Sequence, residues 1–465
     1  MRRLFPAALL ALAALATVGV AALTRADHTF DTAIAAARSA DHAAAKQSIA
    51  DLRRVGPAGL RALLAEYDRT ADASLIPTID AVAAQRDARW SRLYWYTDLA
   101  AAKSAATAEH KPILALRMLG NLTDEYSCAN SRFFRTALYA NQNVSNILRD
   151  KYILVWSSER PVPVVTIDYG DGRVLKRTIT GNSIHYILNA RGEVIDALPG
   201  LYDPQTFASL LTEAVSPATS DNSELIRSYH QSALAALDSE WAANIAPAVP
   251  VYGLSPASVA QLASARAFAK DELESPLVSA ASPTPAPHAA AAALLAQSKL
   301  GVEGPLVRAV VPANPPHAAI AMRLTASKGR VESSMISNLV PPAAMIPADA
   351  NPELWSTLAA RHPATLDRHS IDMIRFQNPA AYINPAKLDQ VVNNFQQAIA
   401  IDTLRNNQLF RRHILGWLQE SAIPMGLLNK RVYSDLFLTP RSDPWLGMVP
   451  DSTYSALTGD GCAIN

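Results

Sequence analysis

The sequence predicts one α/β domain set between two helical regions. Three observations lead to this fold class: a helical pattern from Phe30 to about Arg86, alternating helix and strand segments between Leu99 and Leu211, and a stretch from Ser216 to Asn465 that is rich in Ala, Leu and Pro with few strand signals. A chain of 465 residues, 49% of them apolar, has material for two or three hydrophobic cores.

The N-terminus is typical of an export segment. Arg2 and Arg3 precede an uncharged apolar run from Leu4 to Leu23. Small residues offer cleavage sites after Ala22 and Ala26, while the run is also about long enough to span a bilayer uncleaved. We therefore expect residues 1–26 to be a signal peptide or an N-terminal anchor, and the protein to be periplasmic or secreted.

The middle of the chain opens with helix and strand signals in alternation. A helix is predicted over Leu99–His110 with Asp98 as its N-cap, followed by a buried strand at Ile113–Leu116. A helix containing Cys128 comes next, and then a strand at Tyr152–Trp156.

The rest of this region is richer in strands. The run Val164–Thr180 is divided by Gly170–Gly172, which is typical of a hairpin. Two further strands are predicted at Ile184–Leu188 and Val194–Leu198, and a closing helix starts at Asp203-Pro204. We expect these strands to complete one sheet with helices around it.

The order of these elements resembles that of exported thioredoxin-like domains. Lys111-Pro112 opens the central strand, Cys128-Ala129-Asn130-Ser131 stands where the family has Cys-x-x-Cys, and Ser183–Asn189 stands where its cis-proline-led strand would be. The resemblance implies a thioredoxin-like domain, with a central mixed sheet flanked by helices, over residues 96–216. A helical segment over residues 27–95 would precede it.

Two departures from the family pattern affect function. Ser131 replaces the resolving cysteine, and Ser183 occupies the cis-proline position. A dithiol cycle passes through a mixed disulfide that a second thiol must attack, and a serine hydroxyl cannot do so. We therefore expect no dithiol redox chemistry from this domain.

Cys128 is the first candidate site residue. A thiol at a helix N-terminus is acidified, so Cys128 could be a reactive monothiol with Ser131 as hydrogen-bond donor to the thiolate. The alternatives are a buried structural cysteine or a bridge to Cys462, the only other cysteine. The sequence leaves these interpretations open.

Further candidates lie near the expected carboxyl edge of the sheet, where open α/β folds gather ligands. Glu159 and Arg160 follow the strand predicted to end at Trp156, and we group them with Ser183 as candidate binding residues. An ordinary surface ion pair is the alternative for Glu159 and Arg160. His185 is expected to be a core histidine with one hydrogen bond rather than a catalytic one.

Charge and motifs exclude several function classes. Lys+Arg 42 against Asp+Glu 41 gives a net charge of +1, so no overall field attracts nucleic acid or an anionic membrane. No His, Cys, Asp and Glu group has metal-ligand spacing, and neither a Gly-rich phosphate loop nor a nucleophile elbow is present. We expect no metal, no cofactor and no nucleic-acid partner, and membrane contact only through an uncleaved N-terminal segment.

Residues 217–465 are predicted to form an α-helical domain with an internal repeat. Aligning Asp271–Lys299 with Leu300–Lys328 gives 14 identities in 29 positions. A fixed period with proline at helix starts predicts stacked helices at about 256–340.

Two functions of different classes follow from these observations. The first is an exported binding or scaffolding protein that recognises an exported protein or peptide. The second is a monothiol oxidoreductase or isomerase of the thioredoxin family acting through Cys128. An activity in the C-terminal half is a third alternative, for which the sequence names no residues.

Overall fold

The computed structural model describes residues 30–39, 41–162, 164–168, 170–178, 182–256, 259, 352–377, 379–380, 382–437 and 441–442. The chain divides into two units. The first consists of Met1–Trp95 with Leu122–Asp124, and the second of Tyr96–Asn121 with Glu125–Asn465. The predicted segment 1–26, nearly all of the predicted repeat at 256–340, and Cys462 lie outside the described residues.

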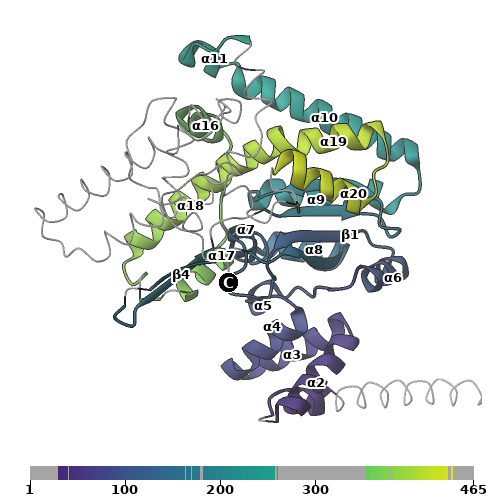
Figure 1. Cartoon of the computed structure of the whole chain (residues 1–465), viewed down its shortest axis with the longest axis vertical. Coiled ribbons are helices and arrows are strands. Elements are labelled where there is room, and N and C mark those ends of the chain that lie inside the picture. The colour runs from purple at the N-terminus through teal and green to yellow at the C-terminus, as the bar shows by residue number, and fades with distance from the viewer. Residues whose placement is uncertain are drawn as a thin grey trace, which may run out of the picture. The chain divides into compact units, whose positions relative to one another are not determined.

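The described part of the first unit is helical. A helix over residues 30–37 is followed by α2 (His42–Arg54), α3 (Pro57–Thr70), η1 (Ala73–Leu75), α4 (Ile76–Ala83) and α5 (Ala88–Ser91), drawn in purple and dark blue in Figure 1. Their apolar faces enclose one core, because leucine and isoleucine recur at helical spacing. The largest members of this core are Leu52, Leu60, Leu63, Leu64, Leu75 and Ile79.

Helices α2 and α3 approach each other very closely at Gly59. A Cβ atom added to Gly59 would lie 2.2 Å from the carbonyl oxygen of Leu52 and 3.0 Å from its carbonyl carbon. Since both are backbone atoms, neither can rotate away. Only glycine therefore fits at this position of α3.

Asp80, near the end of α4, caps the start of α5. Its carboxylate accepts hydrogen bonds from the backbone N–H groups of Ala88 at 2.9 Å and Asp87 at 3.1 Å. Burial nevertheless raises the pKa of Asp80 from its usual value near 4 to about 6. Between about pH 4 and pH 6 the folded unit therefore holds a proton on this carboxyl that the unfolded chain would release.

We expect the stability of the first unit to fall as pH rises from about 4 to about 6. Below pH 4 the carboxyl is protonated in both states. Between the two pKa values only the folded state retains the proton, so raising the pH favours unfolding, by on the order of 1–3 kcal/mol in total. The free energy of unfolding can be measured in urea by tryptophan fluorescence, from pH 4 to 7, for the wild type and for Asp80→Asn. The difference between the two pH profiles is the contribution of Asp80. Parallel pH profiles of the two proteins would contradict it.

The second unit contains a small mixed sheet flanked by helices. Its strand order is β2-β1-β5-β6, with β1 (Ile113–Leu119) parallel to β2 (Ile153–Arg160) and antiparallel to β5 (Ile184–Leu188), which pairs antiparallel with β6 (Val194–Pro199). Every residue of β5 and β6 is buried. These strands are mostly apolar because helices cover both of their faces, and His185 and Asp196 are buried polar exceptions.

Helices that adjoin this sheet in sequence also pack near it. They are α6 (Leu99–Glu109), α7 (Ala129–Phe133) with the π-helical segment η2 (Phe134–Leu138), α8 (Gln142–Lys151) and α9 (Pro204–Thr219). Helices α8 and α9 contact each other and the sheet, and α6 contacts β1 and β2. Asp98 accepts a hydrogen bond from the N–H of Ala100 at 2.9 Å, the N-cap that the sequence predicts.

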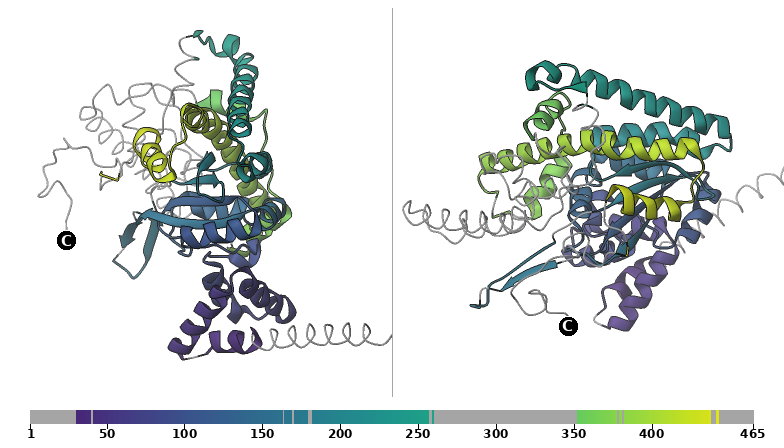
Figure 2. Two further views of the ribbon diagram at one scale, coloured as in Figure 1. Left: turned by 90° about the vertical axis from the view of Figure 1, so that its right-hand side faces the viewer. Right: turned by 45° about the horizontal axis from the view of Figure 1, so that its top comes forward.

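A separate two-stranded hairpin is inserted between β2 and β5. It pairs β3 (Val164–Asp168) with β4 (Val174–Thr178), and Gly170 and Gly172 in its turn have φ angles of +74° and +89°. Figure 2 shows this hairpin extending away from the four-stranded sheet.

The described C-terminal part of the unit is helical and packs around the sheet. Its elements are α10 (Ser223–Ile245), α11 (Ala248–Tyr252), α16 (Pro352–Ala359), α17 (Arg368–Gln377), α18 (Pro385–Arg405), η5 (Asn406–Arg411), α19 (Arg412–Glu420), α20 (Met425–Arg431) and η6 (Val432–Leu436). The π-helical segment η5 joins α18 to α19, and both η5 and α19 contact β6.

A buried ion pair connects β6 to η5. The Arg411 guanidinium contacts both carboxylate oxygens of Asp196, at 2.6 and 3.2 Å, and the two side chains are 3% and 0% exposed. The Tyr229 hydroxyl on α10 donates to the same carboxylate at 2.5 Å, as does the N–H of Ala197 at 2.7 Å. Both charges are therefore satisfied without solvent.

Candidate functional site

The candidate site lies at the carboxyl end of β1, where Cys128 begins α7. Cys128 is the N-cap residue of this helix, and its N–H donates to the carbonyl of Leu119 at 3.4 Å. Its exposed fraction is 0%. The structure thus places Cys128 at the helix start expected from the sequence, but in the protein interior.

Ser131 lies in the first turn of α7 and is also buried. Its hydroxyl oxygen is 2.5 Å from the Ser127 hydroxyl and 2.9 Å from the carbonyl oxygen of Cys128. Neither contact is with the sulfur atom of Cys128. The Ser131 hydroxyl therefore stabilises the turn that holds Cys128.

Ser183 stands directly before β5 and connects it to α7. Its hydroxyl accepts a hydrogen bond from the Asn130 side chain at 2.9 Å, and its carbonyl accepts one from the N–H of Gly200 at 2.9 Å. No peptide bond among the described residues is cis. Cys128, Ser131 and Ser183 are thus brought to one buried region around the start of α7.

The interpretation of Glu159 and Arg160 as a charge pair beyond a strand ending at Trp156 is wrong. Strand β2 continues to Arg160, because its pairing with β1 persists through a register shift at Met118 and Leu119. The register shift leaves Glu159 as an extra residue between the pairs Met118–Ser158 and Leu119–Arg160. Glu159 instead pairs with Arg117 of β1 at 3.2 Å.

The C-terminal helices cover this region. The Tyr433 hydroxyl of η6 donates to the carbonyl of Asn182 at 2.9 Å, in the segment that leads to Ser183. The Tyr186 hydroxyl of β5 donates to the Asn429 side chain of α20 at 3.1 Å. Figure 2 shows α20 alongside the sheet. We refer to α20 and η6 together, residues 425–436, as the C-terminal cover.

The cover is fixed by neutral tyrosines. Burial raises the pKa values of Tyr186 and Tyr433 well above that of an exposed tyrosine, and the nearby Glu159 carboxylate raises them further. Both hydroxyls therefore remain protonated and keep donating to their acceptors. These contacts hold residues in place and offer no proton for transfer near neutral pH.

His185, on β5, is fully buried. Its Nε2 atom is 2.7 Å from the Tyr139 hydroxyl, and burial lowers its pKa to about 3. The ring also packs against Phe134 and Phe207, with centroids 4.6 and 5.2 Å away. A neutral imidazole enclosed by aromatic rings belongs to the core, with the single hydrogen bond expected of it.

Sequence reasoning missed Arg117, Tyr186, Asn429 and Tyr433. Asn429 and Tyr433 are four positions apart, so they lie on one face of a helical segment together with apolar neighbours. That spacing could have indicated that the face is buried. It could not have indicated the contact with a loop some 250 positions earlier.

The described residues provide neither a metal site nor a membrane-spanning helix. They contain no group of three or more His, Cys, Asp and Glu side chains that could hold a metal ion. Within the same residues, none of the helices has the length and apolar character needed to cross a bilayer. Comparison of the chain with models of protein families, with curated protein sequences and with solved structures gave no match.

Proposed function

We propose that this chain is an exported binding or scaffolding protein whose thioredoxin-like domain does not run dithiol redox chemistry. Its partner would be an exported protein or peptide. The order α6, β1, α7, α8, β2, β5, β6, α9 and the mixed pairing of the four strands support the thioredoxin-like assignment. The inserted β3–β4 hairpin departs from the simplest form of that order.

The observation that carries the proposal is the burial of Cys128. A thiolate exchanges disulfides only if another sulfur can approach it in line. The residues around Cys128 bury it completely, so a disulfide has no path to its sulfur in the folded protein. A monothiol enzyme would need this sulfur at the surface. The buried helix start and the C-terminal cover therefore favour a structural role for the domain.

Two measurements on the reduced protein test this proposal. In a Cys462→Ser background, alkylation of Cys128 by iodoacetamide is expected to be at least about a hundredfold slower in buffer than in urea, because it requires local opening. Reduction of insulin by dithiothreitol is expected to be no faster with the protein than without it. Cys128→Ser provides the matched blank for both assays.

The opposite results would favour the monothiol enzyme. Equal alkylation rates in buffer and urea would show an accessible sulfur. Insulin reduction that disappears in Cys128→Ser, but persists in Cys462→Ser, would assign the activity to Cys128 alone.

A further inference from the structure

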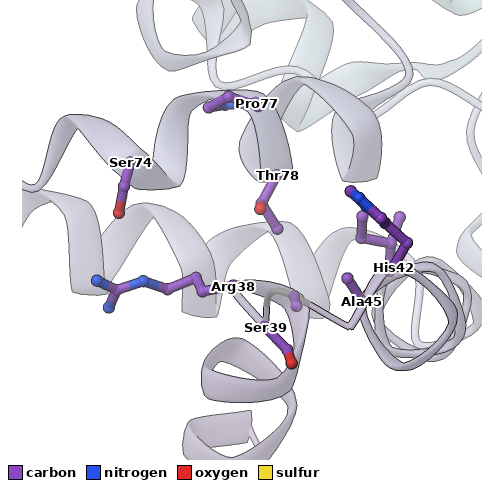
Figure 3. Close-up of a pocket in the computed structure, with 9 residues that line it drawn as sticks. Arg38, Ser39, His42, Ala45, Ser74, Pro77 and Thr78 are labelled. Carbon is purple, nitrogen blue, oxygen red and sulfur yellow. The ribbon is translucent and has the colours of Figure 1, made fainter.

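A cavity of about 410 Å³ opens in the first unit between the end of its first helix, α2 and the segment formed by η1 and α4 (Figure 3). Its volume lies in the range of sites that hold small molecules. None of its lining residues belongs to the region around Cys128. Whatever it binds is therefore additional to the function proposed above.

Part of the cavity wall is formed by small apolar side chains. Ala45 and Ile49 of α2 line the cavity together with Ala37 and Pro77. His42, Ala45 and Ile49 are spaced by three and four positions, so α2 presents a single face to the cavity. A small aliphatic group could cover these side chains, and no Phe, Tyr or Trp is among the lining residues.

The ionisable side chains that line the cavity are both nitrogen bases. They are Arg38 and His42, and no carboxylate is among the nine lining residues. Figure 3 shows the Arg38 guanidinium below Ser74, with His42 at the other side of the cavity. This arrangement favours an anionic group over a cationic one.

Arg38 is held in position by an acidic residue outside the cavity wall. Its Nη2 atom lies 2.5 Å from Asp72 Oδ2, and Asp72 accepts a hydrogen bond from the N–H of Ser74 at 2.9 Å. Hydrogen bonds from Ser74 lower the pKa of Asp72, so this carboxylate stays charged. A guanidinium has five N–H donors, and one contact with Asp72 leaves others for a ligand.

Thr78 adds a hydroxyl group to the cavity wall. Its exposed fraction is only 6%, and its hydroxyl has no hydrogen-bond partner among the residues that the structure describes. Figure 3 shows the side chain directed from α4 into the cavity. Since this hydroxyl lines the cavity, a ligand oxygen could replace the water that otherwise contacts it.

We propose that this cavity binds a short-chain carboxylic acid. Arg38 takes the carboxylate with charge-assisted hydrogen bonds, the Thr78 hydroxyl donates to a ligand oxygen, and the aliphatic chain packs on Ile49 and Ala45. His42 bounds the site at the far side. Butyrate, with one carboxylate and three further carbons, is a suitable probe.

Isoleucine methyl NMR spectra of the purified full chain test the proposal, with the Ile49 δ1 resonance assigned by Ile49→Val. Butyrate is expected to shift this resonance to a saturating value while leaving Ile187, in β5, unchanged. 1-Butanol should bind at least about tenfold more weakly, because it lacks the charge that a guanidinium recognises. A linear, non-saturating shift, or equal effects of butyrate and butanol, would overturn the proposal.

Three variants distinguish specific binding of butyrate in the cavity from general electrostatic attraction of butyrate to the protein. Arg38→Gln is expected to weaken butyrate binding at least about tenfold, and Thr78→Val about threefold with the Arg38–Asp72 pair intact. Lys46→Gln removes an equal charge from an exposed position of α2 that does not line the cavity, and should leave binding within about twofold. Equal weakening by Arg38→Gln and Lys46→Gln, or no effect of Thr78→Val, would contradict the assignment.

Discussion

Replacing Arg411 by methionine is expected to lower the free energy of unfolding of the second unit by about 3–5 kcal/mol. The substitution leaves the Asp196 carboxylate buried with only the Tyr229 hydroxyl and the Ala197 N–H as partners. An uncompensated buried charge costs far more than the loss of one contact, because its hydration is not recovered. Urea unfolding followed by circular dichroism measures the difference.

The neighbouring arginine provides a matched control. Arg412 pairs with Asp238 at 2.6 Å, but the two side chains are 38% and 54% exposed. Arg412→Met should therefore change the same quantity by less than about 1 kcal/mol. If both variants lost a similar free energy of unfolding, burial would not be the reason why the Asp196–Arg411 pair matters for stability.

A double variant keeps this test valid if Arg411→Met does not fold. Replacing both partners, as in Asp196→Leu with Arg411→Met, removes the orphaned charge and should recover part of the stability. A double variant that is less stable than Arg411→Met would contradict the explanation by desolvation.

Gly59→Ala is expected to destabilise the first unit by about 2–3 kcal/mol, although alanine is the better helix former. The added methyl group would lie 2.2 Å from the Leu52 carbonyl oxygen, so α2 and α3 must separate and open the core between them. This cost exceeds the gain of up to about 1 kcal/mol that alanine brings to a helix interior. Thermal or urea unfolding followed by tryptophan fluorescence reports the change.

Gly416 of α19 is the control, because a Cβ atom added there meets nothing within 4 Å. Gly416→Ala should stabilise its unit by about 0.5–1 kcal/mol. If Gly59→Ala were neutral or stabilising, the close crossing of α2 and α3 would not exist as described.

The strands of the second unit were predicted from sequence because buried strands appear as short apolar runs. Ile113–Leu116, Ile184–Leu188 and Val194–Leu198 all lie in strands. The end of β2 was missed because its last residues are polar, and only their pairing with β1 keeps them extended. The sequence around the end of β2 gives no information about its pairing with β1.

The helix that closes the α/β region contains a proline in its interior. Helix α9 continues through Pro217 to Thr219, with Pro217 and Ala218 both buried. Proline removes one backbone donor from a helix, which makes it an apparent stop in the sequence. Packing of the following turn outweighs that loss here.

Only those features of the candidate site that depend on neighbouring residues in the sequence were predicted. The sequence predicted a helix containing Cys128, and the resemblance to thioredoxin-like domains placed Cys128 at its start, where the structure has it. The contacts of Tyr433 and Asn429 with the segment before β5 and with β5 span 251 and 243 positions. Such pairings depend on the assembled fold, and no spacing rule connects their members.

The separation between Asp196 and Arg411 also bears on how the chain reaches its native state. These partners are 215 positions apart, and closing a flexible loop of that length costs about 5 kcal/mol of chain entropy. During synthesis, strand β6 leaves the ribosome long before η5, so every shorter nascent chain carries a core carboxylate with no counter-ion. The second unit must therefore finish folding after translation of residue 411, and chains truncated before that point should be selectively removed by proteolysis.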